Sequence, residues 1–241
     1  DSKSGIPFPG IGGLNPSLSA HEGVSKQADT PFLFVQMATM IKNLIFDFGK
    51  VLVDYDFDVF FAMYIHDEKR RKAFTPVIYN ERLQQLLDYE RKPFDEIMED
   101  IVNENPEYEA EIRHFIAHYP ELVTGEIEGM RALLTSLKAE GYSLYGLTNW
   151  CSKVHHTMRQ FEIFKLLDGR VISSEEHMVK PNADIYLTLL QRYNLKPEEC
   201  LFTDDRAENI AAAEALGMQG IVFHNAEQFE RELRERILSS N

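Results

Sequence analysis

The chain has 241 residues, enough for one or two domains with a sizeable buried core. Its 39 acidic residues outnumber its 25 basic ones, and the formal net charge of −14 argues against nucleic acid as a partner. Two cysteines are too few for a disulfide framework and indicate a reducing, cytoplasmic environment, while no apolar run reaches the roughly 18 residues of a membrane span.

Residues 1–39 differ from the rest of the chain. The segment "GIPFPGIGGLNPSLS" is rich in Gly, Pro and Ser and has no periodicity, and the short apolar run "PFLFV" has no basic segment before it. A signal peptide is therefore not expected. We interpret these residues as an N-terminal extension, a remnant of cloning or the result of a start site placed too early, and exclude them from the fold prediction.

The first convincing strand is "NLIFD" at residues 43–47, an apolar run that ends on Asp47 just before Gly49. After it, apolar residues recur with helical spacing. The clearest runs are Leu83, Leu86 and Leu87; Phe94, Ile97, Met98, Ile101 and Val102; and Tyr108, Ile112, Phe115, Ile116 and Tyr119. The spacing predicts a small helical bundle over residues 57–128.

Strands and helices alternate in the remainder of the chain. Strands are predicted at 142–148, 170–174, 200–204 and 220–223, and helices at 128–141, from about 152, and at 182–193, 206–217 and 225–238. Gly141 and Gly217 are expected to end two of these helices. This alternation predicts an α/β fold, a doubly wound parallel sheet with right-handed crossovers. Residues 40–56 and 129–241 would form this Rossmann-like core, with the helical bundle inserted after its first strand.

Polar side chains lie at the carboxyl ends of three of the predicted strands, and a lysine precedes the helix that leads into the 200–204 strand. Carboxyl ends of parallel strands meet at one edge of a sheet, so these groups should converge. Oxygen ligands suit Mg²⁺, a lysine and a hydroxyl can hold phosphate oxygens, and an aspartate can accept a phosphoryl group. Each residue alone is an ordinary turn or helix-start residue, but together they predict phosphoryl chemistry. The set is Asp47, Thr148, Asn149, Lys180 and the pair Asp204-Asp205.

Four segments carry these residues in order: "IFDFGKVLV", "LYGLTNW", "SSEEHMVKP" and "LFTDDRAENI". They resemble the four motifs of the haloacid dehalogenase-like superfamily, over essentially residues 40–223. The helical insert lies where that family places a cap, between the first and second motifs. The glycine-containing first motif, "TNW" and the "DDxxxN" pattern most resemble the subgroup that includes bacterial α-glucose-1-phosphatase.

The resemblance implies a Mg²⁺ site. Asp47 would be both nucleophile and metal ligand, and the backbone carbonyl of Gly49 would be a second ligand. Asp205 would be the third, because Asn209 lies four residues later as the family pattern requires. Asp204 and Asn209 would then lie behind the ligands, although the sequence alone leaves the order of Asp204 and Asp205 open.

The resemblance also implies an anion site and two departures from the family. Thr148 and the adjacent Asn149 backbone would bind phosphate oxygens, and Lys180 would brace both Asp47 and the phosphate. Most phosphatases of the family have a proton-donating aspartate two positions after the nucleophile, where this chain has Gly49. His177 occupies a position where glycine is usual, which suggests a different loop conformation.

Three features could replace the missing donor. Asp54 or Asp56, just downstream, could reach the site, or the cap could supply a donor. Alternatively, the substrate could have a leaving group that needs little protonation, such as the hemiacetal oxygen of a sugar 1-phosphate. The last option predicts a preference for hexose 1-phosphates over the matching 6-phosphates.

Other reactive side chains have simpler interpretations. His114 and His118 are one helical turn apart, but two ligands do not complete a metal site, so a surface pair is expected. Cys151 borders the second motif without an evident activating base and is interpreted as a packing residue. Trp150 either lines the entrance to the site or anchors the cap.

The sequence thus predicts a Mg²⁺-dependent phosphatase of a small phosphorylated metabolite, acting through an aspartyl-phosphate. It would be a monomer or weak homodimer with neither nucleic acid nor membrane as a partner. One alternative is a 2-haloacid dehalogenase that uses Asp47 without metal; Asp204 and Asp205 argue against it, since they would repel a metal-free nucleophile. The other is a catalytically silent binding protein, suggested by Gly49 but disfavoured by the retention of the other motif residues.

Overall fold

The computed structural model describes residues 40–239, so the interpretation of residues 1–39 lies outside the described chain. Five strands form one sheet in the order β5-β4-β1-β6-β7, and every neighbouring pair is parallel. The chain adds β4 and β5 on one side of β1 and then β6 and β7 on the other, which confirms the doubly wound sheet. The strands are β1 (Asn43–Phe46), β4 (Ser143–Thr148), β5 (Gly169–Ile172), β6 (Cys200–Asp204) and β7 (Gln219–Val222).

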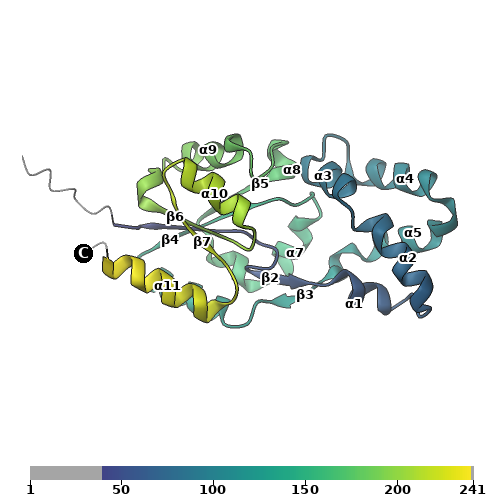
Figure 1. Cartoon of the computed structure of the whole chain (residues 1–241), viewed down its shortest axis with the longest axis horizontal. Coiled ribbons are helices and arrows are strands. Elements are labelled where there is room, and N and C mark those ends of the chain that lie inside the picture. Colours follow the sequence, from purple (N-terminus) through teal and green to yellow (C-terminus); the bar gives the residue numbers. More distant parts are fainter. Residues whose placement is uncertain (1–39, 240–241) are drawn as a thin grey trace, which may run out of the picture. The chain divides into compact units, whose positions relative to one another are not determined.

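Helices cover both faces of the sheet, with α9 and α10 on one side and α11 on the other (Figure 1). Alternate residues of β1 explain the two layers: Leu44 and Phe46 belong to one buried cluster, and Ile45 belongs to a second. A strand that is apolar on both faces is what a covered parallel sheet requires. The helices of this part are α6 (Met130–Ala139), α7 (Val154–Gln160), α8 (Ser173–Glu176), α9 (Ala183–Arg192), α10 (Ala207–Ala215) and α11 (Ala226–Ser239).

The ends of the predicted elements agree closely with those observed. Gly141 and Gly217 follow α6 and α10 with φ of +98° and +91°, the left-handed conformation that glycine adopts without a steric penalty. The strand predicted at 170–174 is shorter than expected, because Ser173 begins the one-turn helix α8. No helix within residues 40–239 is long and apolar enough to cross a membrane.

The region between β1 and β4 is mainly helical, and Figure 1 shows its helices grouped together. All five apolar residues predicted to share one face of α4 are buried, whereas Leu86 of α3 is 41% exposed. The helices are α1 (Phe57–Ala62), α2 (Glu68–Ile78), α3 (Glu81–Tyr89), α4 (Phe94–Glu104) and α5 (Glu109–His118).

The prediction of helix through residue 128 was wrong at its end. After the short 3₁₀ helix η2 (Tyr119–Leu122), the chain forms β3 (Val123–Glu126), which pairs antiparallel with β2 (Val53–Tyr55). Pro120 and Gly125 weaken helix formation here. The two chain segments that enter and leave the helical insert instead satisfy each other's backbone hydrogen bonds.

Candidate active site

The register of the sheet brings the predicted polar residues to one edge. Phe46 pairs with Gly146 of β4 and with Thr203 of β6, so the carboxyl ends of the three strands lie at the same edge of the sheet. The carboxylates of Asp47, Asp204 and Asp205 converge to within 4.8 Å of one another. Within the described part of the chain, no other group of three His, Cys, Asp or Glu residues is arranged in this way.

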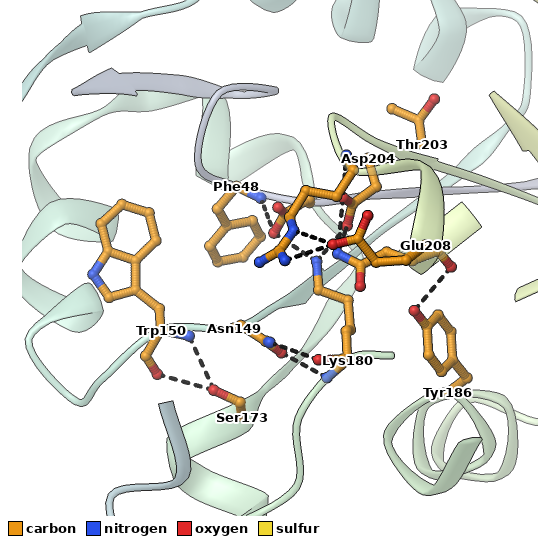
Figure 2. A network of polar contacts seen from close by, with 12 residues as sticks. Phe48, Asn149, Trp150, Ser173, Lys180, Tyr186, Thr203, Asp204 and Glu208 are labelled. Atoms are coloured by element: carbon orange, nitrogen blue, oxygen red, sulfur yellow. Dashed lines mark hydrogen bonds and ion pairs between the residues drawn. The ribbon is translucent and has the colours of Figure 1, made fainter. Parts of the chain in front are cut away.

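Lys180 lies among these carboxylates. Its Nζ is 2.9 Å from Asp47 Oδ1 and 2.6 Å from Asp204 Oδ2, and only 1% of its side chain is exposed. Figure 2 shows the Lys180 side chain directed toward Asp204. Burial lowers the pKa of Lys180, but the two carboxylates outweigh this effect and raise the pKa overall. The lysine therefore remains charged and neutralises one of the three acidic groups. The remaining negative charge makes the cluster suited to a cation.

Asp47 lies directly after β1. Its Oδ1 accepts a hydrogen bond from the Phe48 amide at 2.7 Å, and 13% of its side chain is exposed. Burial is the main cause that raises its pKa to about 6; the charge of Lys180 opposes this rise, and that of Asp204 adds to it. A cation bound to the cluster would favour the ionised, nucleophilic form of Asp47.

Asp204 and Asp205 have different environments. Asp204 is fully buried, and its oxygens accept hydrogen bonds from Lys180 Nζ, from Asn209 Nδ2 at 2.9 and 3.0 Å and from the Arg206 amide at 2.9 Å. Asp205 is exposed and lines the cavity described below. The carboxylate of Asp204 is thus occupied by protein groups, whereas that of Asp205 faces open space.

Thr148 is the last residue of β4, and Asn149 follows it. The Asn149 side chain makes two hydrogen bonds to the Lys180 backbone (Figure 2). Its Nδ2 donates to the Lys180 carbonyl oxygen at 3.0 Å, and its Oδ1 accepts from the Lys180 backbone N–H at 2.8 Å. This side chain therefore holds the loop that carries the lysine. The Thr148 hydroxyl is buried and has no hydrogen-bond partner within residues 40–239. A buried hydroxyl without a partner is costly, and a phosphate oxygen that reached it would satisfy it. Thr148 itself is not among the residues that line the cavity described below.

A cavity of about 460 Å³ adjoins the acidic cluster, and the sheet loops and the helical insert both line it. The loops at the sheet edge and the start of α10 contribute mainly polar groups, whereas the segments from β2 to η2 contribute mainly aromatic and apolar ones. The first group is Asp47, Gly49, Asn149, Lys180, Asp205, Arg206 and Asn209, with Trp150 and Cys151. The second is Tyr55, Phe57, Tyr79, Gln84, Leu87, Asp88, Phe115, Tyr119 and Leu122.

The position usually held by the family's proton donor is filled by a ring. A Cβ atom on Gly49 would lie 2.8 Å from Cε1 of Tyr55, so a larger side chain would have to displace that ring. The downstream carboxyl groups do not take the donor's place. Asp54 forms an ion pair with Lys50 at 2.7 Å, Asp56 caps α1, and neither lines the cavity.

The other singled-out residues have structural partners. Trp150 lines the cavity, and its Nε1 donates a hydrogen bond to the Tyr119 hydroxyl of the insert at 3.0 Å. It therefore both borders the site and contacts the cap. Cys151 is buried, and burial raises the pKa of its thiol to about 12, consistent with a packing residue. The rings of His114 and His118 stack with 4.2 Å between their centroids.

His177 has φ of +54°, which explains why glycine is usual at this position in the family that the motifs resemble. Its Nδ1 lies 2.8 Å from the carbonyl oxygen of Tyr89, at the end of α3. The loop conformation is therefore the one that glycine favours, and the histidine adds a contact to the insert.

Sequence reasoning missed the cavity residues that the insert supplies. Asp88 is the clearest example: it lies beside the buried Leu87 on α3, and local sequence does not distinguish it from Asp95 or Asp100 on the next helix. Only the folding of the insert against the sheet edge makes it a site residue.

Comparison with known proteins agrees with this architecture. The family model of haloacid dehalogenase-like hydrolases matches residues 41–217, and the chain belongs to this family. A sesquiterpene phosphatase of Aspergillus oryzae is 33% identical over 109 residues, which are 45% of this chain and 56% of that protein. The chain thus spans only about half the length of that relative.

Two further proteins resemble most of the chain. A glyceraldehyde 3-phosphate phosphatase of Pyrococcus furiosus is 28% identical over 212 residues, 80% of this chain and 85% of that protein. The fold is shared with a family member from Bacteroides thetaiotaomicron, an Asp-to-Ala mutant solved in complex with magnesium and inorganic phosphate. That comparison has a TM-score of 0.63 at 19% identity and covers 80% of this chain and 98% of the other.

Proposed function

We propose that this protein is a Mg²⁺-dependent phosphatase that hydrolyses a small phosphorylated metabolite through an aspartyl-phosphate on Asp47. The observation that carries the proposal is the convergence of Asp47, Asp204 and Asp205 around the buried Lys180, beside a cavity of small-molecule size. Relatives that are phosphatases support the same reaction class.

Mg²⁺ would be held by Asp47, by Asp205 and by the backbone carbonyl of Gly49. The exposed Asp205 carboxylate supports this choice over Asp204, whose oxygens already accept four hydrogen bonds. An all-oxygen ligand set with excess negative charge fits this hard cation. When bound, the ion would neutralise phosphate charge and favour the ionised nucleophile.

The remaining residues would bind and orient the phosphate. Lys180 would neutralise charge on Asp47 and on a phosphate oxygen, and the Thr148 hydroxyl and Asn149 backbone amide would donate hydrogen bonds to other oxygens. Asp47 would then attack phosphorus. A 2-haloacid dehalogenase remains the rival reaction, but three close carboxylates with one lysine are poorly suited to a metal-free nucleophile.

The substrate class has two candidates. The resemblance of the motifs to the α-glucose-1-phosphatase subgroup favours hexose 1-phosphates. The aromatic and apolar lining from Tyr55 to Leu122 favours phosphates of apolar organic groups, since such walls bury apolar ligand surface. A relative that is a sesquiterpene phosphatase supports the second class.

A substrate screen with and without Mg²⁺ tests the function. Activity on phosphate esters should disappear with EDTA and return with Mg²⁺. Comparing hexose 1-phosphates, the matching 6-phosphates and isoprenoid phosphates would then separate the two substrate classes. Hydrolysis of a haloacid in EDTA without phosphatase activity would instead establish a dehalogenase.

A further inference from the structure

We propose that Asp88, supplied by the inserted helix α3, is the proton donor to the leaving oxygen, in the role that Gly49 cannot fill. This inference rests on the proposed phosphatase function and adds a catalytic residue to it. Among the three ways to replace the missing donor, it corresponds to a donor supplied by the cap.

The placement of Asp88 supports this role. It lines the same cavity as Asp47 and Lys180, and its side chain is partly buried. It makes no hydrogen bond or ion pair with another residue in the described range 40–239. Lys92, one helical turn later, pairs with Asp100 at 3.0 Å instead. Because no group within residues 40–239 occupies this carboxyl group, it is available to a substrate bound in the cavity.

The surroundings of Asp88 suit proton transfer. Burial is the main cause that raises its pKa to about 7; Lys180 and Arg206 lower the pKa, and the charge of Asp47 raises it. An acid with a pKa near neutrality can both donate and accept a proton. Other titratable groups on the cavity wall are poor donors, because burial raises the pKa values of Tyr55, Tyr119 and Cys151. Asp205 also lines the cavity, but this group is the proposed metal ligand.

The reaction balances with these two carboxyl groups. In the first step a carboxylate oxygen of Asp47 bonds to phosphorus while the bond from phosphorus to the leaving oxygen breaks. That oxygen keeps the electron pair and takes the proton of Asp88, which releases an alcohol. In the second step Asp88 removes a proton from water as the water oxygen bonds to phosphorus. The aspartyl-phosphate bond breaks, and inorganic phosphate leaves with both carboxyl groups restored.

The test compares two substrates with similar aromatic bodies and different leaving groups, p-nitrophenyl phosphate and 2-phenylethyl phosphate. For Asp88→Asn we expect kcat/KM on the alkyl ester to fall about 10²–10⁴-fold, because its alkoxide needs protonation. The loss on p-nitrophenyl phosphate should be at most a few-fold, since nitrophenolate leaves without help. A merely structural role of Asp88 would reduce both substrates equally.

The matched control is Asp100→Asn, the same change on α4 at a carboxylate paired with Lys92, which should leave both substrates unaffected. Equal losses on both esters in Asp88→Asn, or no loss on the alkyl ester, would overturn the role of Asp88. Failure of the function itself is distinguishable, because the wild-type protein would then hydrolyse neither ester with Mg²⁺.

Discussion

Asp47 is an aspartate at the end of a buried strand, where a carboxylate is costly unless its charge is used. Asp47→Asn keeps the size of the side chain and removes the proposed nucleophile. We expect kcat to fall on the order of 10³-fold or more while the protein stays folded. Steady-state kinetics and a thermal melt measure the two effects. Asp54→Asn, at the exposed pair with Lys50, is the control that should retain activity, and near wild-type turnover in Asp47→Asn would refute the assignment.

The same residue predicts a pH dependence. The pKa of Asp47 is raised to about 6 in the metal-free protein, so the proposed nucleophile becomes protonated as the pH falls through that value. Activity should therefore decline on the acid side. Mg²⁺ in contact with the carboxylate favours its ionised form and should move the midpoint to lower pH. The measurement is kcat/KM against pH at low and at saturating Mg²⁺; an unmoved midpoint would argue against contact between the ion and Asp47.

At the level of elements, the end of α3 makes several hydrogen bonds to the loops at the edge of the five-stranded sheet. Glu90 accepts hydrogen bonds from the amide and the hydroxyl of Ser152, the latter at 2.6 Å. The Tyr89 hydroxyl accepts from Asn182 Nδ2 at 3.1 Å, and the Tyr89 carbonyl contacts His177. These contacts and the β2–β3 pair join the insert to the rest of the chain.

We expect the insert, predicted over residues 57–128, to close over substrate as a unit and exclude water.

Glu90 offers a test of this closure. Glu90→Ala removes the acceptor for Ser152 and should favour an open insert, with a several-fold higher KM and faster amide hydrogen exchange in α3. Glu90→Gln keeps an acceptor oxygen and should lie near wild type. Kinetics and hydrogen-exchange mass spectrometry measure the two effects. Unchanged exchange in Glu90→Ala would show that this contact does not hold the insert closed.

For the whole molecule, the net charge of −14 and the acidic cluster predict that a cation stabilises the folded state. A ligand that binds only the folded form raises its stability, by about 2.7 kcal/mol at 100 times the dissociation constant. Mg²⁺ should therefore raise Tm relative to a potassium salt of equal ionic strength, and EDTA should reverse the shift. Asp205→Asn should lose most of the increase; an equal increase in this variant would indicate binding elsewhere on the acidic surface.

The sequence alone determined the sheet and much of the candidate site. The five sheet strands are short apolar runs, and Gly141 and Gly217 end helices through local backbone preference. The proximity of Asp47, Thr148 and Asp204 follows from their positions in the chain, because parallel strands bring their carboxyl ends to one edge. Such features depend on a residue and its near neighbours in the chain, or on a general rule of sheet topology.

The tertiary structure decided which side chains face the cavity. Asp204 and Asp205 are adjacent in sequence, but they pack differently in the fold. The carboxylate of Asp204 forms an ion pair with Lys180, whereas Asp205 lines the cavity. The strand β3 forms because β2 is its partner. Thr124 of β3 donates a hydrogen bond to the carbonyl oxygen of Asp54 in β2, and these two residues are 70 positions apart in the chain. Asp88 resembles any surface aspartate of a helix until the insert folds against the sheet edge. Burial, pairing and pKa depend on contacts between residues far apart in sequence, which local patterns do not contain.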